Sequence, residues 1–175
     1  MAMELLKASI CDFEEIYREM QKSFIPDELR DKDAARQTFE NESYSVYLAL
    51  ENGEQVGFIT TWHFPDFEFA EHFVVYEKLR NRGFGKKILE KLTEKFPRVV
   101  LEVEHPTTEI AARRLAFYKR CGFCENPQPY TQPAYSPTSS EVPLIIMSYP
   151  QELQNFDDAI AEIKRIVYNF PQSTT

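Results

Sequence analysis

Cysteine and histidine, the residues that build many metal and redox centres, are scarce in this sequence. The 175 residues include three of each, and these are Cys11, Cys121, Cys124, His63, His72 and His105. Three cysteines cannot form a closed disulfide framework, and the three histidines show no spacing that would supply the further ligands of a zinc site. Cys121 and Cys124 are spaced as C-x-x-C, but they follow a predicted helix end, where the helix dipole disfavours a thiolate. We therefore expect no metal or redox centre and interpret both cysteines as small apolar residues.

Long apolar runs and an excess of positive charge are also missing. No stretch is apolar over the length needed to span a bilayer, and the acidic start Met1-Ala2-Met3-Glu4 does not resemble a secretory signal. The formal net charge is -8, which argues against a polyanionic partner because nucleic-acid binding relies on a basic face. These absences predict a cytoplasmic protein without a membrane or nucleic-acid partner.

Glycine is scarce as well, yet two of the five glycines stand close together in a basic loop. The segment Arg80–Lys87 holds both of them together with four cations, and it links an apolar strand to an amphipathic helix. The first N–H groups of a helix lack partners, and the helix dipole adds positive charge at the same end. Glycine lets the backbone approach a ligand and turn its N–H groups inward. The pattern predicts a pyrophosphate site, the alternative being a glycine turn with a solvated basic face.

The glycine spacing excludes two common phosphate loops. The dinucleotide fingerprint G-x-G-x-x-G requires a third glycine where this sequence has Ile88. A P-loop requires G-x-x-x-x-G-K-S/T, which the spacing of Gly83 and Gly85 does not supply.

Two blocks of the sequence resemble the GNAT superfamily of acetyltransferases. The loop Arg80-Asn81-Arg82-Gly83-Phe84-Gly85 matches the family's cofactor motif Q/R-x-x-G-x-G/A after an apolar strand. Further on, Phe117-Tyr118-Lys119-Arg120-Cys121-Gly122-Phe123 matches an aromatic-Tyr pair followed by Gly-Phe. The blocks come in the family's order with a strand between them, and the resemblance covers residues 3–149. It implies a GNAT fold and an enzyme that uses acetyl-CoA.

The resemblance also implies roles for single residues. Tyr118 stands where the family has a tyrosine that protonates the departing thiolate, and Glu102 stands where some members have their general base. A backbone N–H near Val74 or Val75 would polarise the thioester carbonyl. The implied cofactor-binding residues are Phe73, Val74, Val75, Arg80, Asn81, Arg82, Gly83, Phe84, Gly85 and Lys86.

A second candidate base comes from the predicted strand 67–75. Every second residue of that strand shares a face, and this set is Phe67, Phe69, Glu71, Phe73 and Val75. If the face is buried, desolvation raises the pKa of Glu71 towards the range useful for a general base. The alternative is a partly covered face with an ordinary solvated carboxylate. The choice between Glu71 and Glu102 stays open.

Periodicity and turn signals predict the other elements. Strands are expected at residues 3–9, 44–50, 55–64, 67–75, 99–103 and 144–149. Helices are expected at 12–24, at 27–39, after the basic loop as far as Pro97, from a threonine-capped start within 106–109 to Gly122, and at 153–167. Asn52-Gly53 predicts a hairpin, and the helix after the basic loop predicts parallel pairing of strands 67–75 and 99–103. The first two helices either cover the core or line an acceptor pocket at their junction.

Residues 126–143 hold five of the eleven prolines, which predicts a long stiffened loop with no room for a strand. By the resemblance this loop lies on the acceptor side. Tyr130 and Tyr135 are therefore candidates for substrate binding, with structural packing of either ring as the alternative.

The chain after Pro150 is not required by the family core. Leu153, Phe156, Ile160, Ile163 and Val167 follow a 3,4 spacing, so we expect an amphipathic helix that docks on its own domain or forms a dimer interface. The predicted division is a GNAT acetyltransferase domain at 1–149 and a helical extension at 150–175 that packs on it. Either a monomer or a homodimer is compatible with this pattern.

The sequence thus predicts a single α+β domain of GNAT type, with a mixed, mostly antiparallel sheet, helices on both faces and a C-terminal amphipathic helix. The expected function is acetyl transfer from acetyl-CoA to a primary amine of a small molecule or peptide by direct attack. The competing hypothesis is a non-catalytic module that binds acyl-CoA as a sensor or interaction platform.

Overall fold

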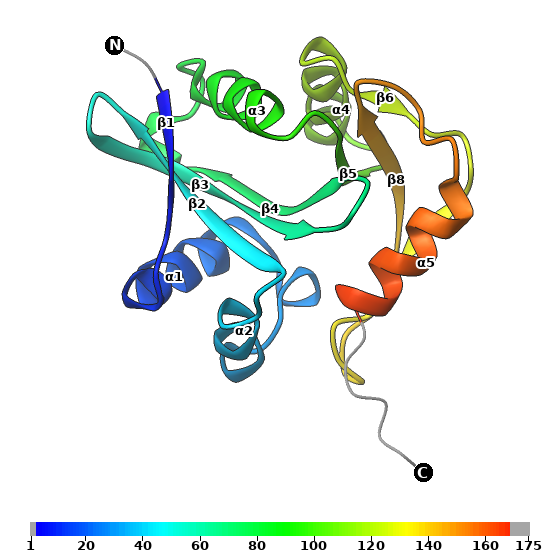
Figure 1. Cartoon of the computed structure of the whole chain (residues 1–175), viewed down its shortest axis with the longest axis horizontal. Helices are drawn as coiled ribbons and strands as arrows, with labels where there is room; N and C mark the ends of the chain where they lie inside the picture. Colours follow the sequence, from blue (N-terminus) through cyan, green and yellow to red (C-terminus); the bar gives the residue numbers. More distant parts are fainter. Residues whose placement is uncertain (1–2, 169–175) are drawn as a thin grey trace.

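A twisted mixed sheet forms the centre of the computed structural model, which describes residues 3–168 (Figure 1). Within those residues the eight strands are β1 (Met3–Lys7), β2 (Tyr44–Glu51), β3 (Glu54–His63), β4 (Glu68–Val75), β5 (Val99–Glu104), β6 (Cys124–Glu125), β7 (Tyr130–Gln132) and β8 (Val142–Tyr149). The strand order is β1-β2-β3-β4-β5-β8-β6, and β7 also pairs with β8. Every pair is antiparallel except β4 with β5.

The helices cover both faces of the sheet. They are α1 (Phe13–Ser23), α2 (Lys32–Phe39), α3 (Phe84–Lys95), α4 (Glu109–Arg120) and α5 (Phe156–Ile166). Figure 1 shows α3 and α4 on one face and α1 and α2 on the other. Buried side chains of α1 and α5 share one apolar cluster, and those of α3 and α4 share a second. The predicted α+β class, with helices on both faces and a C-terminal helix, is confirmed.

Local sequence signals explain where several elements begin and turn. Asn52 and Gly53 have φ angles of 53° and 83°, which is the positive-φ pair that a tight hairpin between β2 and β3 requires. The side chain of Thr108 accepts a hydrogen bond of 3.1 Å from the N–H of Ala111 and so caps the start of α4. Both features were predicted from the sequence and are confirmed.

The two parallel strands at the middle of the sheet stay together only briefly. Glu68 pairs with Val99 and Ala70 with Leu101, and there the pairing ends, although β4 runs on to Val75. The expected parallel crossover through α3 is therefore confirmed. Beyond Ala70 and Leu101 the two strands are no longer paired with each other, and we call this unpaired interval at their carboxyl ends the gap.

A β-bulge lies in β4 where this gap opens. Ile59 pairs with Phe73 but Thr61 pairs with Ala70, so β4 contains one more residue than β3 between these two pairs. Such an extra residue reverses the side-chain alternation of the strand. Phe69 accordingly packs in the cluster beneath α1, whereas Phe73 packs in the cluster beneath α3 and α4. The prediction that residues 67, 69, 71, 73 and 75 share one face is wrong beyond Glu71.

The predicted second helix is divided in two. A short 3-10 turn covers Pro26–Glu28, and α2 begins only at Lys32. Leu29 between them is extended, and the carboxylate of Asp31 caps α2 by accepting from the N–H of Ala34 at 2.8 Å. The connection between the two pieces carries Arg30 into the interior.

The proline-rich segment is not entirely a loop. Tyr130–Gln132 forms the short strand β7, paired antiparallel to β8 with Thr131 opposite Pro143. The prolines at 129 and 133 flank this strand instead of interrupting it, so its own N–H groups remain free to pair. The prediction of a segment without room for a strand is wrong at these three residues.

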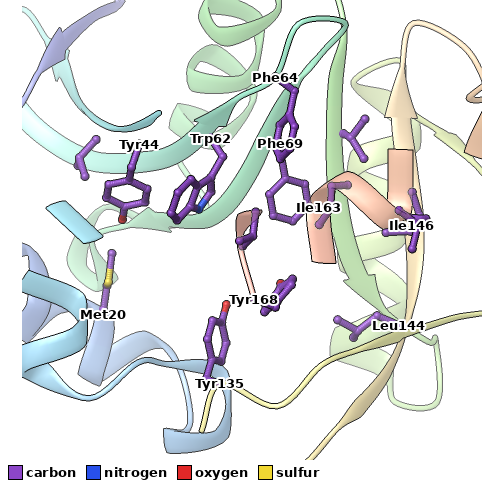
Figure 2. Packing of buried hydrophobic residues seen from close by; sticks show 14 of the residues in the cluster. Met20, Tyr44, Trp62, Phe64, Phe69, Tyr135, Leu144, Ile146, Ile163 and Tyr168 are labelled. Carbon is purple, nitrogen blue, oxygen red and sulfur yellow. The ribbon is translucent and has the colours of Figure 1, made fainter. Parts of the chain in front are cut away.

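The C-terminal helix packs on the same sheet. Phe156, Ile160 and Ile163 join the apolar cluster formed by α1, β3 and β5, and Ile163 is fully buried. Figure 2 shows Ile163 among Phe69, Ile146 and Tyr168. Among residues 3–168, no helix combines the length and the apolar character needed to cross a bilayer.

Ile163→Ala should destabilise the protein by about 2–5 kcal/mol, because it removes fully buried methyl groups and leaves a cavity beneath α5. The matched control is Ile110→Ala on α4, where the side chain is 66% exposed and the expected change is within about 0.5 kcal/mol. Urea unfolding followed by circular dichroism measures both. Equal midpoints for the two variants would contradict the packing of α5.

Candidate active site

Two carboxylates occupy neighbouring positions on β4 and β5, just beyond the last paired residues of the two strands. The register of the pair, Ala70 with Leu101, makes Glu71 and Glu102 the first residues of their strands beyond the last pairing. Parallel strands place such neighbours on the same face of a sheet. Here that face is the one covered by α1 and α5, because Val100 belongs to their cluster whereas Leu101 and Val103 belong to the other. The structure therefore brings both candidate bases together.

Beyond the carboxylates, β4 presents unpaired backbone groups to the gap. The N–H of Tyr76 donates to the carbonyl of Val56 on β3 at 2.9 Å. Because N–H groups alternate in direction along a strand, those of Phe73 and Val75 point away from β3, towards the side that β5 has left. The sequence placed the polarising N–H near Val74 or Val75, and this alternation favours Val75.

The basic loop begins immediately after this strand and ends in α3. Asn81 and Gly83 have positive φ angles of 63° and 82°, which turn the backbone sharply, and no side chain caps the first N–H groups of α3. The side chain of Arg80 is already engaged, since its Nε donates to the carbonyl of Val75 at 3.0 Å. This hydrogen bond connects the loop to the end of β4. The guanidinium of Arg82 lies over the ring of Phe84, 5.5 Å from its centroid.

Gly85 lets the loop, β4 and α4 meet. A Cβ added there would lie 3.3 Å from the ring of Phe117 and 3.7 Å from the ring of Phe73. At Gly83 the same test finds nothing within 4 Å, so the backbone faces open space. The two glycines of the motif therefore serve different needs: Gly85 permits close packing, and Gly83 permits a left-handed turn beside a free volume.

Tyr118 extends from α4 into the apolar cluster beneath α3. It is 8% exposed and its ring lies 5.9 Å from that of Phe123. Burial raises the pKa of Tyr118 to about 12, because the phenolate would lose its hydration. The hydroxyl therefore stays protonated at neutral pH, which is the state required of a proton donor.

Glu71 is a paired carboxylate. The Nη1 of Arg30 lies 3.0 Å from both of its oxygens, Trp62 Nε1 donates to Oε1 at 2.8 Å, and the hydroxyl of Tyr135 donates to Oε2 at 2.5 Å. Burial acts to raise the pKa of Glu71, but the charge of Arg30 and these hydrogen bonds outweigh it, so the pKa is lowered. The expectation of a raised pKa for Glu71 is wrong, because it considered burial and did not anticipate the charge of Arg30.

Arg30 is the residue that sequence reasoning missed. It is 8% exposed, lies between the rings of Trp62 and Tyr135 at 5.6 and 4.9 Å, and donates through Nη2 to the carbonyl of Val167 at 2.9 Å. Nothing in the local sequence distinguishes it from the exposed cations around it. A polar segment predicted as a surface helix gives no signal that one of its side chains is buried.

Glu102 has hydrogen-bond donors but no cation. The hydroxyl of Tyr130 donates to Oε2 at 2.5 Å, and Oε1 accepts from the hydroxyl of Tyr168 at 2.5 Å and from Nε2 of Gln132 at 3.2 Å. Burial is the largest influence, and the negative charge of Glu71 acts in the same direction, so together they raise the pKa of Glu102 to about 7 against the opposing effect of the hydrogen bonds. This carboxylate exchanges a proton near neutral pH.

The two tyrosines proposed as acceptor contacts each bind a carboxylate. Tyr130 contacts Glu102 and Tyr135 contacts Glu71, and a third tyrosine, Tyr168, packs against Tyr135 with ring centroids 5.2 Å apart. Figure 2 shows Tyr135 and Tyr168 beside each other in this cluster. Their part in substrate binding stays a prediction. Tyr168 follows the last apolar position of the predicted final helix, which gave no sign that it reaches the site.

Two hollows lie outside the gap. A cavity of about 20 Å³ lies between α1, α2 and the sheet beside Arg30 and His72, with room for about one water molecule. This volume favours core cover as the role of the first two helices. A groove of about 490 Å³, lined in part by Phe64, Phe67 and Arg98, lies at the amino ends of β4 and β5, away from the basic loop.

Comparisons with known proteins identify the fold and the family of the domain. Residues 42–125 match the model of the GNAT acetyltransferase domain. A solved structure from Bacteroides thetaiotaomicron, assigned to the GNAT family of acetyltransferases, superposes with a TM-score of 0.90 at 29% identity, over 95% of this chain and 99% of that one. No curated protein matches the sequence significantly.

More distant structures share the fold. The ribosomal-protein-S18-alanine N-acetyltransferase of Escherichia coli has a TM-score of 0.64 at 21% identity, over 86% of this chain and 95% of that one. The structure of AAC(6')-Ib with paromomycin and acetyl-CoA has a TM-score of 0.61 at 17% identity, over 90% and 97%. At these identities the likeness shows the fold alone.

Stability should depend on pH through Glu102. Because its pKa is raised to about 7 in the folded state, the folded protein binds the proton more tightly, and stability falls as the pH rises from about 4.5 through about 7. The glutamine of Glu102→Gln cannot titrate, so the free energy of unfolding of the variant should rise by about 3 kcal/mol relative to that of the native protein across that interval. Urea unfolding at several pH values measures both free energies. A difference between them that does not change with pH would contradict the raised pKa.

Glu71→Gln should behave in the opposite way. Its lowered pKa means that Glu71 stabilises the fold above its unfolded pKa and loses this effect as the pH falls through its folded pKa. At neutral pH the substitution leaves Arg30 buried without a counter-ion, which should cost about 3–5 kcal/mol. The same unfolding series measures this deficit, which should shrink in acid. A deficit that persists unchanged in acid would contradict the ion pair.

Proposed function

Because this chain belongs to the GNAT acetyltransferase family, we propose that it transfers an acetyl group from acetyl-CoA to a primary amine of a small molecule or peptide. The observation that carries the proposal is the environment of Glu102. Glu102 has a pKa of about 7, its hydrogen-bond donors among residues 3–168 include no cation, and it lies just beyond the last pairing of β4 with β5. A carboxylate with these properties suits the removal of a proton from an ammonium group near neutral pH.

The backbone of the basic loop and of the first turn of α3 is suited to bind coenzyme A. Gly83 faces open space beside the uncapped start of α3, where a pyrophosphate would find unpaired N–H groups and the positive end of the helix dipole. Arg82 and Lys86 add positive charge nearby. The N–H groups of Phe73 and Val75 line the gap, so one of them is suited to polarise a thioester carbonyl. These features support acetyl-CoA as the co-substrate.

Three residues then divide the chemistry. Glu102 takes the proton of the acceptor ammonium, and the free amine attacks the thioester carbonyl. The N–H of Val75 stabilises the negative charge that develops on the carbonyl oxygen. When the C–S bond breaks, Tyr118 donates its proton to the departing thiolate and regains one from the cationic nitrogen of the intermediate, which leaves a neutral amide. The two substrates are held together in the gap, which supplies part of the rate by orientation.

The structure favours Glu102 over Glu71 as the base. A base must hold its proton at an intermediate affinity, and Glu71 remains ionised because Arg30 neutralises it.

The proposal is tested by turnover. The protein is incubated with acetyl-CoA and a panel of primary amines while free thiol is measured, and Glu102→Gln is measured beside it. We expect thiol release that depends on an amine, and a loss of about a hundredfold or more in kcat/KM for the variant. Tight binding of acetyl-CoA without turnover by any amine would instead favour the non-catalytic module.

Tyr118→Phe should lower kcat by about a hundredfold while the dissociation constant for coenzyme A stays unchanged, because the hydroxyl acts only on the leaving thiolate. Steady-state kinetics and calorimetry measure the two quantities. Unchanged turnover would remove Tyr118 from the mechanism, and a parallel loss of coenzyme A affinity would indicate a binding role.

Gly83→Val should weaken coenzyme A binding by about tenfold or more, because a side chain would enter the space beside the start of α3 and strain the turn. Gly53→Val is the matched control. Its φ of 83° is almost the same as the 82° of Gly83, and it too has nothing within 4 Å, but it lies in the β2–β3 hairpin. Both variants should lose similar stability, and only Gly83→Val should lose affinity in calorimetry. Equal affinities would contradict the phosphate-loop assignment.

A further inference from the structure

We propose that Tyr168, from the segment after α5, is a positioning residue for Glu102, and that Arg30 holds this segment in the site. The inference rests on the proposed function only in naming Glu102 as the base. It assigns a role in the reaction to a part of the chain that lies beyond residues 42–125, which match the family model. The C-terminal extension is thereby a component of the active site as well as a cover for the core.

The first support is the contact itself. The hydroxyl of Tyr168 donates to Oε1 of Glu102 at 2.5 Å and accepts from Nε2 of Gln132 at 3.0 Å, and the residue is 5% exposed. Gln132 also reaches Oε1 directly, at 3.2 Å. A buried hydroxyl that is fixed by both an acceptor and a donor has one orientation, so it defines where the carboxylate lies.

The distribution of donors decides which oxygen is available. Oε1 of Glu102 accepts from Tyr168 and Gln132, whereas Oε2 accepts from Tyr130. A carboxylate oxygen has two lone pairs, so these bonds leave capacity on Oε2. Tyr168 therefore fixes one side of the carboxylate while the other can take the proton of the acceptor.

The second support is the way the segment is held. Arg30 donates through Nη1 to Glu71 and through Nη2 to the carbonyl of Val167, so one buried guanidinium ties β4 to the residue before Tyr168. Val167 is 4% exposed and belongs to the same apolar cluster as α5. The packing of α5 brings the chain to the site, and Arg30 then sets the last two described residues in place.

Several groups act on the charge of Glu102 from the elements around it. Glu71 on β4 opposes ionisation, Arg30 is neutralised by Glu71, and the hydroxyl of Tyr135 donates to Glu71. The hydrogen bonds that favour the ionised form come from Tyr130, Tyr168 and Gln132. Loss of one strong donor shifts this balance towards the protonated acid, which is inactive as a base.

The experiment compares the full-length protein with Tyr168→Phe, a change that keeps the ring and removes the hydroxyl. The ionisation of Glu102 is followed directly by the pH titration of its carboxyl carbon in a protein labelled with carbon-13 glutamate, with Glu102→Gln to assign the signal. The pH profile of kcat/KM is measured in parallel. We expect the carboxyl pKa and the acidic limb of the profile to rise together by about one unit, which lowers kcat/KM below pH 6 by about tenfold and leaves the plateau at high pH within about threefold.

Tyr47→Phe is the matched control, because Tyr47 is 8% exposed and belongs to the other apolar cluster, on the opposite face of the sheet from the site. It should leave both the titration and the profile in place. Arg30→Lys keeps a positive charge beside Glu71 but removes the second donor to Val167, so part of the same shift should appear.

The outcomes separate the two proposals. An unchanged carboxyl titration in Tyr168→Phe, or an equal shift in Tyr47→Phe, overturns the role of Tyr168. A shifted titration without any movement of the kinetic limb overturns it too, and it shows that Glu102 is not the base. If no amine supports turnover, the proposed function fails, whereas the titration still reports whether Tyr168 governs the ionisation of Glu102.

Discussion

The central constraint on the structure is that two carboxylates are buried on neighbouring strands where the pairing of β4 with β5 ends. Glu71 and Glu102 occupy neighbouring positions on one face in a buried region, where two like charges repel strongly and neither is well hydrated. Arg30 resolves the conflict by pairing with Glu71 alone. One carboxylate is thereby kept charged, and the other is left to exchange a proton near neutral pH.

Other features of the molecule follow from this arrangement. Glu71 lies on the same face as Phe69, which is the face of Arg30, and the bulge in β4 then turns Phe73 to the opposite face, beside Gly85 and Phe117. The same strand can therefore serve the acceptor chemistry on one face and the cofactor loop on the other. The segment after α5 completes the first of these faces with Tyr168, which links the stability of the core to the geometry of the proposed base.

Prediction from sequence succeeded where the signal was local. The Asn52-Gly53 hairpin, the cap at Thr108 and the helix after the basic loop depend on residues that are neighbours in the chain. It was less successful with Glu71: the residue was identified, but its pKa was expected to rise and is lowered instead. Strict alternation hid the bulge, and the burial of Arg30 had no local sign, because a cation that pairs with a distant strand looks like any surface arginine in its own segment.

The sequence by itself pointed to the family and to a proposed donor side, since the turn from Arg80 to Gly85 depends on backbone geometry that glycine spacing encodes directly. It also named Glu102, Tyr118 and the tyrosines of the proline-rich segment as candidates. Only the tertiary structure decided which carboxylate is paired with a cation and which exchanges a proton near neutral pH. That difference depends on Arg30, Tyr130 and Tyr168, which lie far apart in the chain and meet at β4 and β5. A pKa is set by burial and by the charges and hydrogen bonds around a group, and these exist only once the chain has folded.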